Sequence, residues 1–204
     1  MDSTSVSTPP GDEALERLRQ GNERFLTGAA KFPTMQKEIL ADLVKGQHPY
    51  ATILSCSDSR VPPELVFDAG FGELFIIRVA GNVLSPEVAG SIQYAGRHLH
   101  TPLFVVLGHT KCGAVSAALQ SRLHGTRQLS RIQLLVDSIV PGLEALDPQL
   151  TPEAMIVQAV EANVRWTMRQ ILGSLEAGRQ PADGGFKLVG AIYELETGRV
   201  RFLD

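Results

Sequence analysis

The sequence predicts an α/β fold, namely a single domain with a small, mainly parallel sheet, an antiparallel edge strand and flanking helices. Two observations support this prediction. Four apolar runs lack the alternation of a strand with one wet face, so we expect strands buried on both faces. Between these runs, apolar residues recur at helical spacing. The length of 204 residues suits one domain with a core large enough to fold unaided.

The expected strands are short and end at polar or turn residues. The four apolar runs cover residues 50–56, 74–80, 103–107 and 187–195. After the last of them comes the turn Glu196-Thr197-Gly198, followed by a short run at residues 200–203. A tight turn of this kind returns the chain antiparallel to the strand before it. We therefore expect residues 200–203 to form the antiparallel edge strand.

The expected helices begin and end at recognisable signals. The first covers residues 12–27, with Leu15, Leu18 and Phe25 on one face and Gly28 just past its end. The last begins with Thr151-Pro152, an N-cap residue followed by proline at the first helical position. The other helices are expected at residues 35–44, 86–98, 114–124 and 130–140, and the last extends over 151–177. Residues 1–11 are predicted to form a disordered tail, and residues 12–204 one domain that includes an N-terminal helical arm.

Charge and hydropathy exclude several classes of function. The formal net charge of −3 and the lack of a Lys/Arg cluster argue against nucleic-acid binding. No apolar run approaches the roughly 18 residues that span a bilayer, which argues against a membrane protein. The Ser/Thr/Pro-rich start has neither a basic secretory leader nor an Arg-rich transit peptide, so we expect a cytoplasmic location.

Two of the expected strands are followed by metal-ligating residue types. Cys56 ends the first strand, and His109 and Cys112 follow the third. The carboxyl ends of parallel strands meet at one edge of a sheet, so we expect these side chains to converge. Two sulfurs and one imidazole are ligands that zinc prefers, and three protein ligands leave a fourth position open for catalysis. Cys112 should also start a helix, and the dipole of that helix favours the thiolate form of its side chain. Gly113 has no side chain and should let the backbone come close to the metal site.

Five stretches of the sequence resemble the β-class carbonic anhydrases. The two that carry most of the resemblance are Cys56-Ser57-Asp58-Ser59-Arg60 and His109-Thr110-Lys111-Cys112-Gly113, and residues 78–82, 90–95 and 105–108 also match. The resemblance runs from about residue 15 to the end. It implies one zinc ion per chain, held by Cys56, His109 and Cys112, and reversible hydration of carbon dioxide to bicarbonate and a proton. It also implies a homo-oligomer, a dimer or a multiple of one, with the N-terminal helical arm packed across a partner subunit.

The resemblance also implies roles for residues around the metal. Asp58 would orient the attacking hydroxide as a catalytic residue, and Arg60 would keep Asp58 ionised and aimed. Asp58 could instead bind zinc as a fourth ligand and close the site, since members of this family are known in both arrangements. Gly81 and Asn82, with Gly113, would shape the substrate pocket. The plainer interpretation of Asp58 and Arg60 is an ion pair that stiffens a loop.

Two other functions stay open at this level. The same scaffold could hydrolyse carbonyl sulfide or carbon disulfide, which are also small, linear and apolar. A non-catalytic zinc or redox protein is the second alternative, and it predicts a filled fourth position or a Cys56–Cys112 disulfide. The pairing of Asp58 with Arg60 favours an enzyme, because a structural zinc site has no use for it.

Overall fold

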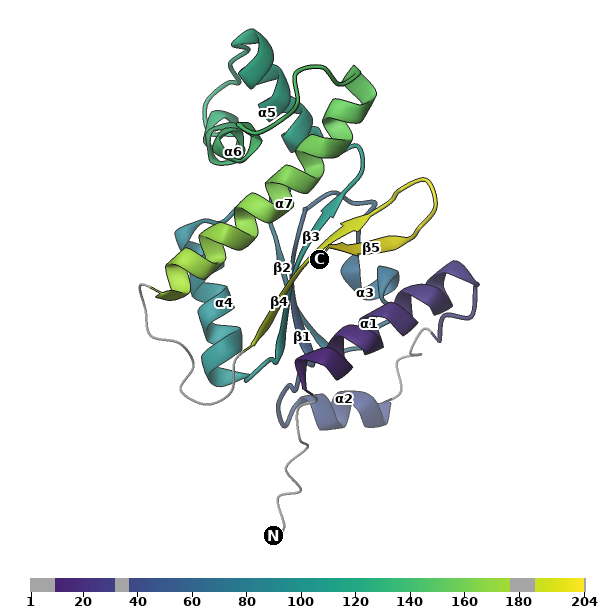
Figure 1. Cartoon of the computed structure of the whole chain (residues 1–204). Coiled ribbons are helices and arrows are strands. Elements are labelled where there is room, and N and C mark those ends of the chain that lie inside the picture. The colour runs from purple at the N-terminus through teal and green to yellow at the C-terminus, as the bar shows by residue number, and fades with distance from the viewer. Residues whose placement is uncertain (1–9, 32–36, 177–185, 204) are drawn as a thin grey trace.

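The protein is built on a five-stranded sheet with the strand order β2-β1-β3-β4-β5 (Figure 1). A computed structural model describes residues 10–31, 37–176 and 186–203. The first four strands in this order are parallel, and β5 is antiparallel to β4. This confirms the predicted mainly parallel sheet with an antiparallel edge strand. The strands are β1 (Ala51–Ser55), β2 (Leu74–Arg78), β3 (Leu103–His109), β4 (Lys187–Tyr193) and β5 (Val200–Leu203).

Helices connect the strands much as the apolar spacing predicts. Of the predicted tail, residues 1–9 lie outside the described residues, and the first helix begins at Gly11. Residues 35, 36 and 177 of the predicted helices also lie outside them. The longer helices are α1 (Gly11–Leu26), α2 (Lys37–Leu43), α4 (Pro86–His98), α5 (Gly113–His124), α6 (Ile132–Ile139) and α7 (Pro152–Glu176). None of the helices described is long and apolar enough to cross a membrane.

Three short elements were not predicted. They are the helix α3 (Pro63–Val66) and the 3-10 helices η1 (Ala80–Asn82) and η2 (Val140–Leu143). Each is a single turn, too short for apolar spacing to reveal. The predicted strands 50–56, 74–80 and 187–195 end one or two residues early, whereas β3 runs two residues further than expected, to His109. The extension pairs Gly108 and His109 with β4.

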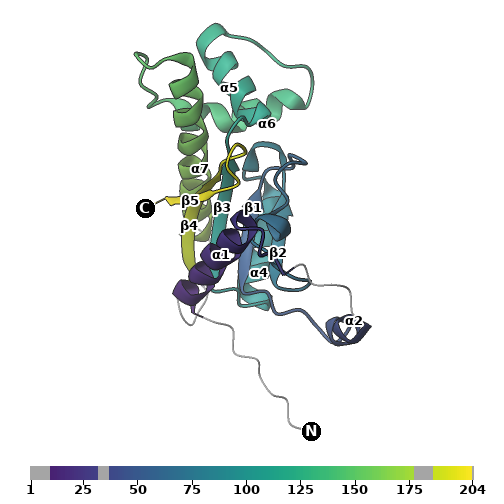
Figure 2. The same cartoon turned by 90° about the vertical axis from the view of Figure 1, so that its right-hand side faces the viewer.

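The sheet separates two apolar layers (Figures 1 and 2). Helices α1 and α3 cover one face, where Leu18, Ile53 and Phe67 are fully buried. On the other face, a second cluster joins the sheet to α4, α5, α6 and α7. Every residue of β1 and of β3 is buried, as strands covered on both sides require.

Helix α1 packs on its own chain. Its buried residues include Ala14, Leu15 and Leu18, which belong to the cluster on the α1 face of the sheet. Asn22 continues the attachment, since its Nδ2 donates to Gly198 O at 2.9 Å and its Oδ1 accepts from Val200 N–H at 2.9 Å. These contacts join α1 to its own chain, and the packing of this arm across a partner subunit stays a prediction. An amphipathic pattern gives the orientation of a helix but not the surface that covers it.

Candidate metal centre

Three potential ligands converge at the carboxyl end of the sheet. Cys56 directly follows β1, His109 is the last residue of β3, and Cys112 is the N-cap residue of α5. Strands β1 and β3 are neighbours, so their ends bring the three side chains together. The two Sγ atoms and the imidazole nitrogen lie within 4.8 Å of one another, and all three residues are buried. Sequence reasoning predicted this convergence.

The imidazole of His109 presents a free lone pair to the two sulfurs. Its Nδ1 lies 2.8 Å from the carbonyl oxygen of Thr110, which can only accept a hydrogen bond. Nδ1 therefore carries the proton, and Nε2 is left as the unprotonated nitrogen. Nε2 is buried and has no hydrogen-bond partner among the described residues. A backbone carbonyl that fixes the tautomer in this way is the usual support of a metal-binding histidine.

The two cysteines are free thiols whose ionisation is linked. The pKa of Cys56 is lowered, first by a hydrogen bond from Cys112 and then by the N–H of Gly81. The pKa of Cys112 is raised, chiefly because it lies beside Cys56, although N–H groups at the start of α5 act in the opposite direction.

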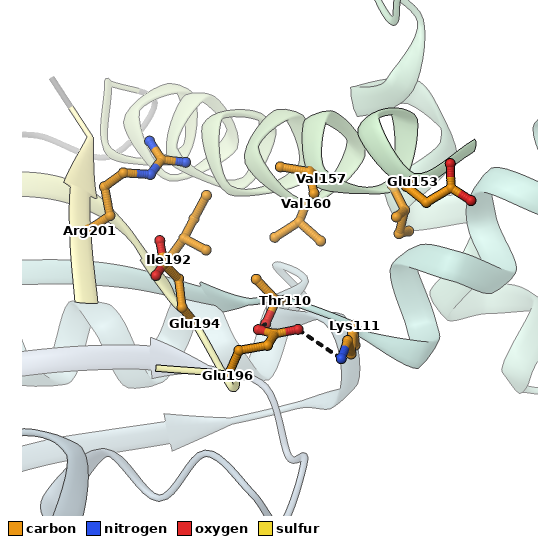
Figure 3. Close-up of a pocket in the computed structure, with 10 residues that line it drawn as sticks. Thr110, Lys111, Glu153, Val157, Val160, Ile192, Glu194, Glu196 and Arg201 are labelled. Carbon is orange, nitrogen blue, oxygen red and sulfur yellow. Dashed lines mark hydrogen bonds and ion pairs between the residues drawn. The ribbon is translucent and has the colours of Figure 1, made fainter. Parts of the chain in front are cut away.

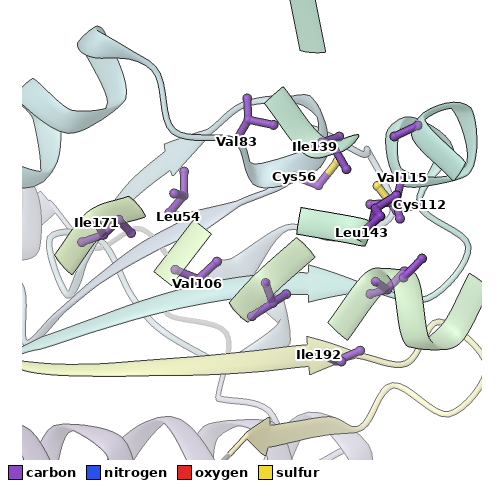
Figure 4. Close-up of a cluster of buried hydrophobic side chains, with 14 of the residues drawn as sticks. Leu54, Cys56, Val83, Val106, Cys112, Val115, Ile139, Leu143, Ile171 and Ile192 are labelled. Atoms are coloured by element: carbon purple, nitrogen blue, oxygen red, sulfur yellow. The ribbon is translucent and has the colours of Figure 1, made fainter. Parts of the chain in front are cut away.

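The residues present suit a zinc ion. Tetrahedral zinc with sulfur and nitrogen ligands places those atoms roughly 3.5–3.8 Å apart, which a small contraction of the cluster would reach. Both cysteines lie at one end of the buried apolar cluster, where Figure 4 shows them beside Val115, Ile139 and Leu143. These apolar walls exclude water from one side of the cluster. Three ligands leave one position free, as in a catalytic zinc site.

Asp58 and Arg60 form a bidentate pair next to the cluster. Asp58 Oδ1 accepts from Arg60 Nε at 2.9 Å, and Oδ2 accepts from the guanidinium NH2 group at 2.7 Å. The backbone N–H of Arg60 adds a third bond, at 3.0 Å. These contacts hold the pKa of the Asp58 carboxyl far below its usual range. Asp58 Oδ2 lies 3.9 Å from His109 Nε2, so the ionised carboxylate lies beside the three-ligand cluster.

Sequence reasoning assigned no role to Arg78, which holds the loop between Cys56 and Asp58. It is the last residue of β2, and its Nε donates to Cys56 O at 3.0 Å. Its terminal NH2 group donates to Asp58 O at 2.6 Å. A charged residue at the end of an apolar strand was the available signal, but the loop that it contacts comes 20 residues earlier in the sequence.

Gly81 and Asn82 form a strained turn beside Cys56. Both have left-handed backbone angles, with φ of 72° at Gly81 and 45° at Asn82. The N–H of Gly81 donates to Cys56 Sγ at 3.3 Å. The left-handed conformation of Gly81 favours glycine, and an added Cβ would lie 2.8 Å from Ile139 Cδ1, which would have to shift.

The place of Gly113 in the substrate pocket stays a prediction. It is the first residue of α5, and an added Cβ would meet nothing within 4 Å. The contacts within the chain therefore do not require glycine at this position, because its Cβ direction opens onto space and not onto a neighbouring element. The side of the cluster next to Gly113 is open.

The loop between His109 and Cys112 is tied to the turn between β4 and β5. Thr110 Oγ1 donates to Glu196 Oε2 at 2.9 Å and accepts from Leu195 N–H at 3.0 Å. Lys111 Nζ lies 2.8 Å from Glu196 Oε1. Figure 3 shows this ion pair at the edge of a cavity of about 380 Å³ between the sheet and α7. Sequence reasoning assigned no role to Thr110 or Lys111, because their common partner lies 86 residues after Thr110.

We expect the Lys111–Glu196 pair to stabilise the protein only above acidic pH. The pKa of Glu196 falls from 4.5 to about 2, mainly because Lys111 donates to it, with backbone and Thr110 contributions. A lowered folded-state pKa gives stability that is present above the unfolded value and lost as pH falls toward the folded one. The difference in urea midpoint between wild type and Lys111→Ala should therefore shrink between about pH 4.5 and 2. If the difference in urea midpoint stays constant over this range, the assignment is wrong. In a Glu196→Gln background, Lys111→Ala should change the urea midpoint little at any pH.

Comparisons with known proteins agree on one family. A family model described as carbonic anhydrase matches residues 51–200, which include all three residues of the cluster. Carbonic anhydrase 2 of Mycobacterium tuberculosis is 36% identical over 192 residues, covering 94% of this chain and 92% of that protein. A carbonic anhydrase of Mycolicibacterium smegmatis is 36% identical over 195 residues, covering 92% and 90%. Among solved structures, a β-carbonic anhydrase of Aspergillus fumigatus has a TM-score of 0.68 and 26% identity, covering 95% of this chain and 90% of that one.

Proposed function

The chain belongs to the β-class carbonic anhydrase family and is a zinc-dependent carbonic anhydrase, and we propose that Cys56, His109 and Cys112 hold one zinc ion per chain. The reaction is the reversible hydration of carbon dioxide to bicarbonate and a proton. The observation that supports the ligand assignment most directly is the buried, unpartnered Nε2 of His109, which lies within 4.8 Å of two free thiols. An orphaned buried acceptor is costly unless a metal or a proton donor satisfies it.

Asp58 and Arg60 are the catalytic residues of this proposal. When bound, zinc would supply the Lewis acidity that turns water into a nucleophile near neutral pH. Asp58 is ionised and can therefore only accept hydrogen bonds, so it would accept one from the attacking oxygen and fix which lone pair faces carbon dioxide. Arg60 occupies both carboxylate oxygens and holds Asp58 in that role. We propose an open site at rest, because Asp58 would have to release Arg60 to become a fourth ligand.

Gly81, Asn82 and Gly113 belong to the substrate pocket in this proposal. Gly81 and Asn82 form the turn beside Cys56, and the open side of Gly113 leaves room for a small molecule next to the cluster. The neighbouring wall is apolar, with Val115 and Ile139 buried in the same cluster as the cysteines. A small, linear, apolar substrate such as carbon dioxide suits this environment.

Neither alternative from the sequence is favoured. The relatives reported above are named carbonic anhydrases, and nothing in the site favours carbonyl sulfide or carbon disulfide. A redox protein predicts a Cys56–Cys112 disulfide, but both cysteines are free. The decisive experiment is stopped-flow carbon dioxide hydration on protein of known zinc content, with carbon disulfide turnover measured on the same preparation. Turnover of carbon dioxide that does not follow zinc content would overturn the proposal.

We further propose that the protein is a homo-oligomer, a dimer or a multiple of one. Several large apolar side chains are exposed in the single chain, notably Leu129 at 85%, Leu134 at 64% and Phe71 at 54%. Leu129 and Leu134 lie five residues apart, just before and within α6, and apolar side chains exposed close together suit an interaction face. Light scattering on the full chain should give at least twice the mass of 22.1 kDa, and a monomer at micromolar concentration would contradict this proposal.

A cytoplasmic location is also part of the proposal. Two buried free thiols placed this close together suit a compartment that keeps cysteines reduced. Cell fractionation with an antibody against the protein would test it, and recovery in a secreted or membrane fraction would contradict it.

A further inference from the structure

We infer that Asn163, on helix α7, is a positioning residue for the Cys56 sulfur and acts on it through the backbone of Gly81. This inference rests on the proposed zinc site. Asn163 is buried, with 1% of its surface exposed, and its Nδ2 donates to Gly81 O at 2.9 Å. Gly81 in turn donates its N–H to Cys56 Sγ at 3.3 Å. One glycine thus links a side chain of α7 to a metal-ligand sulfur.

The orientation of the Asn163 amide follows from the atoms around it. The carbonyl oxygen of Gly81 can only accept a hydrogen bond, so the amide nitrogen must face it. Asn163 Oδ1 has no hydrogen-bond partner among the described residues. Among the described residues, the bond to Gly81 O is therefore the hydrogen bond that compensates for burying the Asn163 amide.

The turn formed by Gly81 and Asn82 needs contacts from the surrounding structure to keep its conformation. Gly81 and Asn82 are consecutive left-handed residues, and such a conformation persists only where the surroundings fix it. A second contact from α7 helps, since Thr167 Oγ1 donates to Asn82 O at 3.2 Å. Helix α7 therefore holds two successive carbonyl groups, and the Gly81 N–H stays directed at Cys56.

The effect expected at the metal is electronic as well as geometric. An N–H donor on a thiolate withdraws charge from the sulfur and sets how strongly it donates to a metal. The Gly81 C=O and the Gly81 N–H belong to adjacent peptide groups joined at the Gly81 Cα. Loss of the Asn163 contact would let the chain rotate about that Cα and would weaken the N–H···S bond. Supporting partners of this kind are typically worth 10–100-fold in metal affinity. We therefore expect Asn163 to tune zinc affinity although it contacts neither metal nor substrate.

The test compares two variants of the same helix. Asn163→Leu removes the donor to Gly81 at similar volume, and Thr167→Val removes only the hydroxyl that contacts Asn82. Zinc affinity is measured by competition with a chelator, and the sulfur-to-metal charge-transfer bands are recorded on cobalt-substituted protein. Asn163→Leu should bind zinc about 10–100-fold more weakly and shift these bands. Thr167→Val, whose contact lies one residue further from Cys56, should change both quantities in the same direction but by less. If Asn163→Leu loses thermal stability but keeps wild-type affinity and bands, its role is merely structural and the inference fails.

A measurement on the wild-type protein covers the case in which Asn163→Leu does not fold. In protein loaded with cadmium-113, the Gly81 amide proton should show scalar coupling to the metal through the Cys56 sulfur. Absence of that coupling would overturn the inference. The zinc proposal fails separately, since it is wrong if wild-type protein does not bind one zinc ion per chain.

Discussion

Replacing Cys112 with serine is expected to remove zinc and carbon dioxide hydration together. Serine nearly matches the volume of this buried side chain, so the fold should survive, but a neutral hydroxyl is a poor zinc ligand beside a thiolate. Since supporting partners alone are worth 10–100-fold in affinity, loss of a ligand should weaken zinc binding by more than about 100-fold. Zinc content measured by atomic absorption and turnover measured by stopped flow should fall in parallel.

Ser116→Ala is a suitable control for this substitution. Ser116 lies one turn further along α5, and its Oγ donates to Cys112 O at 3.0 Å. Its removal affects the backbone of Cys112 and leaves the three ligand side chains in place, so zinc content should stay at one per chain. Full zinc occupancy in Cys112→Ser would show that Cys112 is not a ligand.

Replacing Arg60 with alanine is expected to leave zinc in place and lower kcat/KM by roughly 10–100-fold, the range typical of supporting partners. The substitution removes both side-chain bonds to Asp58 and leaves only the backbone N–H at 3.0 Å. Asp58 then loses its fixed orientation and is free to turn toward the metal position. Arg60→Lys should recover part of the activity, because an ammonium restores charge but cannot form the bidentate pair.

Arg127→Ala controls for the loss of an exposed arginine, since this residue is exposed and lies after α5, away from the cluster in sequence. It should keep wild-type kinetics. Steady-state kinetics and zinc content are measured on each variant. Wild-type turnover in Arg60→Ala would show that the Asp58–Arg60 pair only stiffens the loop.

The strands and the positions of the candidate ligands could be predicted from the sequence for one physical reason. A strand covered on both faces must be apolar at nearly every position, so β1 and β3 are visible as continuous runs. The carboxyl ends of such strands meet at one edge, so the neighbours of those runs, Cys56 and His109, had to lie close together. Asp58 and Arg60 are two residues apart, so their pairing is also local.

Contacts between residues far apart in the chain could not be predicted. Arg78, Asn163 and Glu196 each support the site through a partner at least 20 residues away. Asn163 and Thr167 stand four residues apart beside the apolar stripe of α7, which marks them as facing inward but not what they face.

The sequence by itself determined the fold class, the three-residue cluster and the Asp58–Arg60 pair, because each depends on local apolar patterning or on neighbouring residues. Only the tertiary structure decided which surface covers α1, which nitrogen of His109 faces the sulfurs, and how α7 supports Cys56. Those features depend on packing and on hydrogen bonds between distant segments, where direction and distance matter more than residue type.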